Sequence, residues 1–253
     1  MQPQRLAQHD LVRSAMERDL VRGAVTEALG QTDRENPVLA RSGGPAGNVV
    51  LTAWTGLVLL VLFVAELLTL VDVRGLISWH VAIGALLVPP ALMKTASTGW
   101  RFARYYLRHE PYVAAGPPPT LLRWLGPLVV TSTLGLLASG ILLVLLGEET
   151  GRQTVVSVLG QRVDWVTVHQ AFFAVWCVAT GLHLLGRIVP ALRHTLSRFG
   201  ARAVPGRAGR VGALALAAVA AVVVAVLLVQ ADGSWQDGGR PGGPPPGAAA
   251  VLP

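Results

Sequence analysis

The sequence predicts an all-α membrane protein, built as a four-helix transmembrane bundle followed by a fifth, C-terminal transmembrane helix. Of the 253 residues, 52% are hydrophobic and only 14% are charged, whereas a soluble domain carries about 25% charged residues. The apolar residues fall in long runs, and these runs lack the apolar–polar alternation of a half-buried strand. These observations exclude a soluble multidomain enzyme and a disordered chain.

Five apolar runs are long enough to cross a bilayer, because about 30 Å of hydrocarbon takes roughly 20 residues of helix. Helices are expected, since a backbone in lipid must satisfy its own hydrogen bonds. The expected spans are Val49–Val71, Leu76–Ser97, Trp124–Leu146, Val163–Val189 and Val211–Gln230.

The spans divide the chain into five expected segments. Residues 1–48 form a cytoplasmic N-terminal segment, with an amphipathic helix and then a Gly/Pro linker. Residues 49–192 form the four-helix membrane domain, and residues 193–208 form a basic cytoplasmic linker. Residues 209–230 form the fifth helix, and residues 231–253 form a disordered tail rich in Gly and Pro.

Arginine predicts the orientation, because cytoplasmic connections are enriched in Lys and Arg. The net charge is +7, and it comes mostly from two connections. The one after span two carries Arg101, Arg104 and Arg108, and the one after span four is similarly basic. Both are expected in the cytoplasm, which places the N-terminus inside and the C-terminus outside the cytoplasmic membrane. The charge is therefore a topology signal that favours lipid contact over nucleic-acid binding.

Three histidines fall within the spans, where ionisable groups are costly and tend to mark function. His80 lies near the start of span two and His169 near the start of span four. Both spans run inward, so the two side chains are expected roughly 6–9 Å below the outer interface. Two imidazoles at one depth can ligate both faces of a haem iron. The alternative is a pair of unligated histidines, each hydrogen-bonded within the bundle.

His183 and Lys94 repeat this relationship deeper in the membrane. His183 follows His169 by fourteen residues, and Lys94 follows His80 by fourteen. Fourteen helical steps return to nearly the same face, about 21 Å further along the axis. His183 could hold a second haem, contact a quinone, pack or relay protons. Lys94, the only lysine, could snorkel to the headgroups, pair with a propionate or quinone oxygen, or ligate iron opposite His183.

At these residues the sequence resembles bacterial membrane cytochromes b of the cytochrome b561, hydrogenase b-subunit and formate dehydrogenase gamma-subunit type. More narrowly, it is similar to actinobacterial cytochrome b/b6-like membrane proteins. The resemblance covers about Trp54–Leu192. It rests on the sequence of Trp79–Tyr106 (WHVAIGALLVPPALMKTASTGWRFARYY), Gly116–Pro119 (GPPP) and His169–His183 (HQAFFAVWCVATGLH).

The resemblance implies a cytochrome b-type bundle in which His80 and His169 ligate haem b. It further implies an electron-transfer subunit of a respiratory oxidoreductase, linking the quinone pool to an extracytoplasmic redox partner of the molybdopterin type or similar. The sequence departs from the cytochrome b/b6 pattern at Lys94, where those helices carry a second histidine.

Other residues have both a functional and an ordinary interpretation. Arg74 and Arg162 could pair with the propionates of an outer haem, because guanidinium binds carboxylate in a bidentate way, or they could be loop cations. Glu66 could transfer protons near a quinol site or be an interfacial acid. The alternative function for the whole chain is a non-redox membrane anchor or a transporter.

Overall fold

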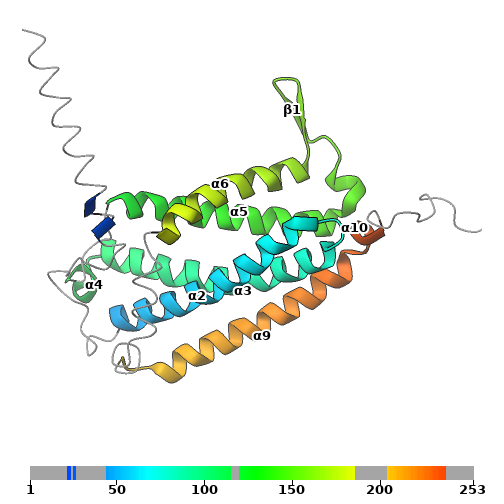
Figure 1. Cartoon of the computed structure of the whole chain (residues 1–253). Helices are drawn as coiled ribbons and strands as arrows, with labels where there is room; N and C mark the ends of the chain where they lie inside the picture. The colour runs from blue at the N-terminus through cyan, green and yellow to red at the C-terminus, as the bar shows by residue number, and fades with distance from the viewer. Residues whose placement is uncertain (1–21, 24, 27–43, 115–119, 186–203, 238–253) are drawn as a thin grey trace, which may run out of the picture.

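Five long helices dominate the computed structural model (Figure 1), which describes residues 22–23, 25–26, 44–114, 120–185 and 204–237. All five are long and apolar enough to cross a membrane, so the prediction of a multi-pass helical membrane protein is confirmed. Most of the expected N-terminal amphipathic helix, most of the basic linker and the tail beyond 237 lie outside the described residues. The long helices are α2 (Gly44–Thr69), α3 (Ile77–Tyr106), α5 (Thr120–Gly151), α6 (Trp165–Leu185) and α9 (Arg207–Ala231).

Short elements occupy the connections between the long helices. The 3-10 turn η2 (Leu70–Asp72) joins α2 to α3, α4 (Glu110–Ala114) follows α3, and α10 (Gly233–Asp237) follows α9. A hairpin of β1 (Val156–Val158) and β2 (Gln161–Val163) joins α5 to α6. Such three-residue strands are too short for a periodic pattern to predict them. The positive φ of Leu159 and Gly160 matches a tight two-residue hairpin turn.

Helix α3 lies at the centre of the bundle and packs closely against α2, α5 and α9, whereas α6 packs closely on α5 (Figure 1). Neighbouring helices alternate in direction. The Asn48 amide near the start of α2 donates to the Ser97 carbonyl late in α3, at 2.9 Å. At the other end, Thr69 of α2 contacts His80 of α3. Helix α9, the fifth span, packs along α3 on the side of the bundle away from α6.

The interior is small and the outer faces are apolar. Leu59, Leu87 and Ala91 are buried together, with Phe63 and Leu137 packed against them. By contrast, large side chains stay exposed on every long helix, including Val61, Trp79, Leu145, Val178 and Leu216. A water-soluble monomer rarely exposes such large apolar patches. Exposed apolar faces on helices of this length are the expected surface of a protein surrounded by lipid.

The two ends of the bundle differ in charge, because basic residues are concentrated at the helix ends and connections on one side and acidic residues on the other. The end where α2 begins and α3 finishes, here called the basic end, carries Lys94, Arg101, Arg104, Arg108, Arg123, Arg207 and Arg210. The opposite end, the acidic end, carries Asp72, Glu148, Glu149, Asp164, Asp232 and Asp237 beside Arg74, Arg152 and Arg162.

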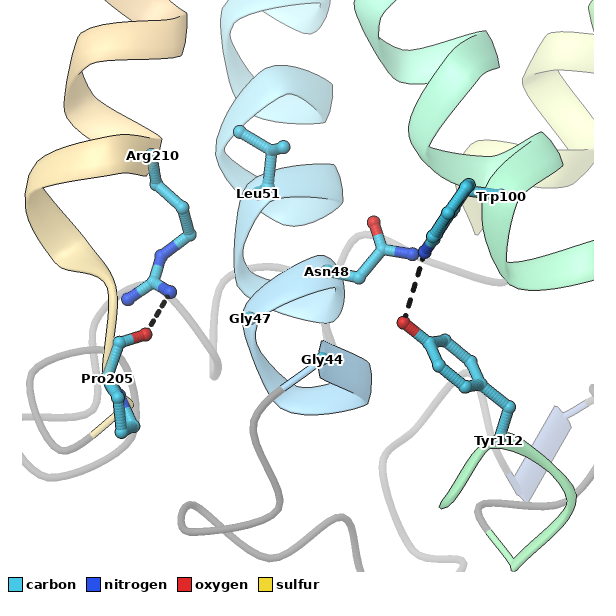
Figure 2. Close-up of a pocket in the computed structure, with 8 residues that line it drawn as sticks. All are labelled: Gly44, Gly47, Asn48, Leu51, Trp100, Tyr112, Pro205 and Arg210. Atoms are coloured by element: carbon cyan, nitrogen blue, oxygen red, sulfur yellow. Dashed lines mark hydrogen bonds between the residues drawn. The ribbon is translucent and has the colours of Figure 1, made fainter. Parts of the chain in front are cut away.

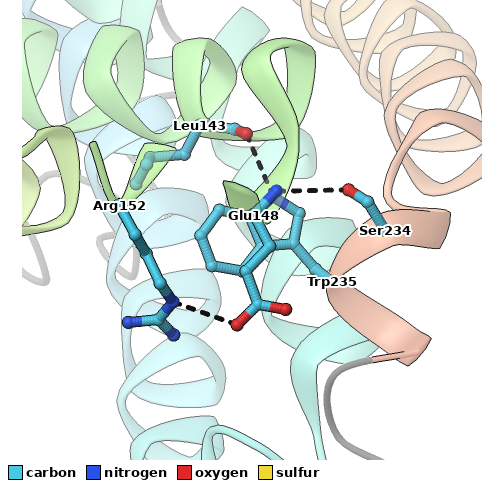
Figure 3. A network of polar contacts seen from close by, with 5 residues as sticks. All are labelled: Leu143, Glu148, Arg152, Ser234 and Trp235. Carbon is cyan, nitrogen blue, oxygen red and sulfur yellow. Dashed lines mark hydrogen bonds and ion pairs between the residues drawn. The ribbon is translucent and has the colours of Figure 1, made fainter. Parts of the chain in front are cut away.

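The start of the tail is ordered against the acidic end of α5. Figure 3 shows Ser234 and Trp235 of α10 beside Leu143 and Glu148 of α5. Trp235 Nε1 donates to the Leu143 carbonyl at 3.0 Å, and the Glu148 N–H donates to Ser234 Oγ at 3.3 Å. Gly147 has φ 73°, which interrupts the helix and turns the Glu148 N–H toward α10. Residues 233–237 therefore differ from the disordered tail that composition predicted.

We predict that Gly147→Ala destabilises the protein by about 1–2 kcal/mol, because an L-residue is strained at positive φ. An added Cβ would also approach Ser234 Oγ to 3.0 Å. The control is Gly212→Ala in α9, where a Cβ meets nothing within 4 Å. Thermal unfolding in detergent should show a lower Tm for Gly147→Ala only. Equal Tm values for both variants would contradict this account of the kink.

Candidate functional site

His80 begins the candidate site, one turn into α3 at the acidic end. Its Nδ1 lies 2.9 Å from Thr69 Oγ1 and 3.0 Å from Glu66 Oε1, both near the end of α2. The tight turn between the helices makes these contacts possible, and the Asp72 carboxylate stabilises that turn by accepting from the Gly75 N–H at 3.0 Å. A short connection thus places two oxygen atoms against one nitrogen of His80.

His169 lies one turn into α6, also at the acidic end. Its Nδ1 lies 2.9 Å from Ser139 Oγ in α5. Gly140 permits this close approach, since a Cβ there would come within 3.1 Å of His169 Cε1. Asp164 caps the start of α6, because its Oδ1 accepts from the Thr167 N–H and hydroxyl, each at 2.7 Å. The cap fixes the first turn of α6, from which His169 projects.

The structure brings the side chains of His80 in α3 and His169 in α6 close together. Their ring centroids lie 6.4 Å apart, and their ring planes make an angle of 86°. Helices α3 and α6 have few or no close backbone contacts, so the two imidazoles provide a side-chain contact between these helices. The sequence predicted that His80 and His169 lie at the same depth in the membrane. The structure also places the two rings next to each other across the bundle.

The hydrogen-bond network is compatible with the same tautomer for both rings. The Ser139 hydroxyl is also within hydrogen-bond reach of the Leu136 carbonyl, and the Thr69 hydroxyl is 2.6 Å from the Glu66 carbonyl. If each hydroxyl donates to its carbonyl, its oxygen accepts from the neighbouring histidine Nδ1. A neutral imidazole has one N–H, so with that proton on Nδ1 each ring would keep its Nε2 lone pair for a metal.

The geometry of the pair fits a single metal between two imidazoles. Metal–imidazole bonds are about 2 Å long and the nitrogen lies about 1 Å from the ring centre, so two imidazoles that held one metal between them would have centroids roughly 6 Å apart. Rotation of one ring about the shared axis leaves both bonds intact, so perpendicular rings are compatible. In the described part of the chain, no group of three or more His, Cys, Asp or Glu residues could hold a metal ion. Two imidazoles are a ligand set that can hold haem iron.

Glu66 is the charged residue of the site. Its side chain is 17% exposed, and its second oxygen, Oε2, is buried without a hydrogen-bond partner. Gly84 of α3 lies beside it, since a Cβ there would be 3.4 Å from Oε1. A buried carboxylate oxygen without a donor is costly. Glu66 therefore provides both an acceptor for His80 and unused acceptor capacity inside the bundle.

His183 lies on the same helix as His169, half-buried toward the basic end. Trp176 and Thr180 precede it at spacings of seven and three residues, and these positions share one helix face. Trp176 Nε1 and Thr180 Oγ1 are buried without a hydrogen-bond partner. The ring of Trp176 packs on Phe63 of α2, with centroids 4.6 Å apart. This face of α6 is thus interior. Its polar atoms lie further along the helix, toward the basic end, than the His80–His169 pair.

Lys94 is directed toward α2. Its Nζ donates to the Thr52 carbonyl at 3.2 Å, and Gly56 makes room for it, since a Cβ there would lie 2.8 Å from Nζ. This contact places the ammonium group in the α2–α3 interface, while His183 belongs to α6. The fourteen-residue pattern relates Lys94 to His80 along α3 but does not specify the helix that Lys94 faces.

The two arginines of the prediction lie at the acidic end. Arg74 is exposed in the turn before α3. Arg162 is exposed in β2, and its Nε donates to Thr154 Oγ1 at 2.7 Å. Both are on the same end of the bundle as the imidazole pair.

Sequence reasoning missed Thr69 and Ser139, the hydroxyl partners of the two histidines. A polar side chain within an apolar span signals an internal hydrogen bond, and this signal could have marked Ser139. The partner of each hydroxyl depends on how two helices are aligned, which the sequence of a single helix does not contain.

Searches against protein-family models, curated proteins and solved structures found no match to this chain. The functional assignment therefore depends on the geometry of the site.

We predict that Asp164→Ala lowers the stability of the protein by about 0.5–2 kcal/mol at neutral pH, because it removes the cap of α6. The hydrogen bonds from the Thr167 side chain and backbone lower the pKa of Asp164 below its usual value. The ionised cap is therefore fully present above the unfolded pKa of about 3.9 and is lost as the pH falls through the lower folded value.

The measurement is the Tm of wild type and Asp164→Ala in detergent between neutral pH and the acid range. The difference between them should be constant above the unfolded pKa and should shrink below it. A difference that stays constant throughout the acid range would refute the ionised cap.

Proposed function

We propose that this protein binds haem b and transfers electrons within the cytoplasmic membrane, with His80 and His169 as the residues that would hold the haem iron. The observation that carries the proposal is the adjacent imidazole pair, with centroids 6.4 Å apart and each Nδ1 bonded to a side-chain oxygen. Haem b needs no covalent attachment to the protein. When bound, it supplies one-electron chemistry between ferric and ferrous iron.

The surrounding residues orient and tune the two ligands. Metal-bound histidines commonly donate their second N–H to a carboxylate or carbonyl, which fixes the ring and increases its basicity. Glu66 provides such a carboxylate for His80, 3.0 Å from Nδ1. Ser139 provides a neutral hydroxyl for His169. In this proposal His80 would be the more basic ligand, and the Glu66 carboxylate, in contact with His80, would favour the oxidised state of the haem iron that His80 held.

The charge at the two ends supports an orientation for the protein. Cytoplasmic connections are enriched in Lys and Arg, so the basic end is assigned to the cytoplasm and the acidic end to the outside. The His80–His169 pair then lies near the extracytoplasmic surface. An electron-transfer subunit with this placement would connect an extracytoplasmic redox partner, of the molybdopterin type or similar, with quinone in a respiratory chain. Arg74, exposed in the turn leading to His80, would pair with a haem propionate, and Arg162 would be the second candidate.

The proposal contains one haem. Lys94 donates to the Thr52 carbonyl of α2, which leaves His183 without support from Lys94 as an opposite ligand. A quinone contact is instead the proposed role of this face of α6, where Trp176 Nε1 and Thr180 Oγ1, on the same face as His183, could donate to the carbonyl oxygens of a quinone headgroup.

We predict that the purified protein shows a Soret band and a reduced b-type α-band, with one haem per chain. His80→Ala and His169→Ala should each abolish the six-coordinate spectrum, because each removes one axial nitrogen. His109→Ala is the matched control, since His109 is exposed at the basic end and contacts Arg104. His183→Ala should also keep one haem.

Two results would contradict this assignment. A folded wild-type protein that stays colourless after haem supplementation would remove the redox function and favour a membrane anchor or transporter. A ratio of two haems that falls to one in His183→Ala would show that the single-haem proposal is wrong.

We also predict that Glu66→Gln raises the midpoint potential of the bound haem, because removing a buried negative charge destabilises the oxidised iron. A tenfold change in the redox equilibrium corresponds to about 59 mV for one electron, and a shift on that order is expected. Ser139→Ala, which removes a neutral partner, should shift the potential less. The potential is measured by redox titration in detergent, and a larger shift for Ser139→Ala would refute the assigned role of Glu66.

A further inference from the structure

A pocket of about 370 Å³ lies at the basic end of the bundle, far from the histidine pair. Figure 2 shows it between the first turns of α2, the last turns of α3, the start of α9 and Tyr112 of α4. It is lined by Gly44, Gly47, Asn48, Leu51, Trp100, Tyr112, Pro205 and Arg210.

Arg210 gives the pocket a buried positive charge. The residue is 7% exposed, and its guanidinium donates to the Pro205 carbonyl at 2.7 Å and to the Val204 carbonyl at 2.8 Å. Its Nε is buried without a hydrogen-bond partner, and Trp54 packs 5.9 Å from its guanidinium carbon. Within the described residues Arg210 forms no ion pair with a carboxylate. A buried charge of this kind favours an anion that can bring a compensating charge.

The backbone around Arg210 adds further donors for an anion. Helices α2 and α9 both begin at this pocket, at Gly44 and Arg207, and the N-termini of helices favour negative groups. Gly47 allows the guanidinium to lie against α2, since a Cβ there would be 3.2 Å from Nη1. No side chain caps α9. The unpartnered Nε is an observation independent of these helix ends, and it also points to an anionic ligand.

The side chains on the opposite wall combine an aromatic surface with one available donor. Trp100 Nε1 donates to the Tyr112 hydroxyl at 3.3 Å, which leaves the hydroxyl proton of Tyr112 to donate to a ligand. Trp100 and Tyr112 are also the residue types that concentrate at the membrane–water interface. The acidic residue of this end in the described chain is Glu110, which is exposed and does not line the pocket.

We propose that this pocket binds the phosphate group of an anionic phospholipid. A phosphate oxygen would accept from Arg210 Nε, from the Tyr112 hydroxyl and from the N-terminal N–H groups of α2, while Leu51 and the aromatic rings contact the apolar part of the lipid. Its position at the basic end of five apolar helices favours a lipid over free phosphate, since the acyl chains extend along an exposed apolar surface. The site is independent of the histidine pair.

The test places the full-length protein in nanodiscs of phosphatidylcholine, with and without phosphatidylglycerol. Phosphatidylglycerol should raise the Tm of wild type and should remain bound in native mass spectrometry. Arg210→Gln should weaken this retention about tenfold or more, because a hydrogen bond to a charged group is lost. Arg207→Gln is the matched control, since Arg207 is exposed one turn earlier in α9 and should retain the lipid.

A second pair of variants keeps Arg210 in place, in case Arg210→Gln prevents folding. Leu51→Glu introduces a carboxylate into the pocket, where it should pair with Arg210 and exclude phosphate. Leu51→Gln has nearly the same size without the charge and should still select phosphatidylglycerol. Equal lipid retention in these two variants would overturn the proposal.

Inorganic phosphate distinguishes the source of the phosphate group. It is added at millimolar concentration to wild type in phosphatidylcholine nanodiscs. We expect a much smaller shift in Tm than phosphatidylglycerol produces. An equal shift would overturn the assignment to a lipid, and no shift with either compound would overturn the site.

Discussion

The structure depends on one constraint, which is that polar groups on membrane-spanning helices must find their partners inside the bundle. Hydrocarbon offers no hydrogen bonds, so an unsatisfied polar group there costs several kcal/mol. Asn48 and Thr52 of α2 therefore meet Ser97 of α3, and Ser139 of α5 meets His169 of α6. These contacts fix the alignment of neighbouring helices, because Leu and Val side chains pack in many registers but each hydroxyl has few acceptors within reach. The candidate site uses the same contacts that align the helices.

The sequence was sufficient to predict what depends on one helix at a time. Length and hydropathy predicted five spans, and helical rise predicted that His80 and His169 lie at one depth. The adjacency of the two rings also depends on how α3 and α6 are placed around α5, which no periodicity encodes. For the same reason the sequence located Lys94 in a span but could not predict its contact with the Thr52 carbonyl. The docking of α10 was missed because it depends on the break at Gly147, where a Glu148 N–H becomes available.

Small residues explain why these polar contacts can be so close. Gly140 allows the His169 ring to approach the backbone of α5, and Gly56 does the same for Lys94 against α2. At Gly135 a Cβ would overlap the ring of Phe172. Glycine in a helix interior costs roughly 0.5–1 kcal/mol relative to Ala, so each position exchanges local helix stability for a close contact between helices. Taken singly from the sequence, each of these glycines indicates only general helix packing.

The two ends of the bundle use their buried charges in opposite ways. At the acidic end the carboxylate of Glu66 lies against His80, so a positive metal placed between the imidazoles would meet a negative group within the protein. At the basic end Arg210 is satisfied by the carbonyls of Val204 and Pro205, and carbonyl dipoles leave its net charge uncompensated. A carboxylate next to a metal ligand suits a metal that gains and loses one electron, because the negative charge then influences which oxidation state is preferred. A site with an uncompensated cation suits a permanent anion. Under the two proposals, the same helices would separate electron transfer at one end of the bundle from lipid binding at the other.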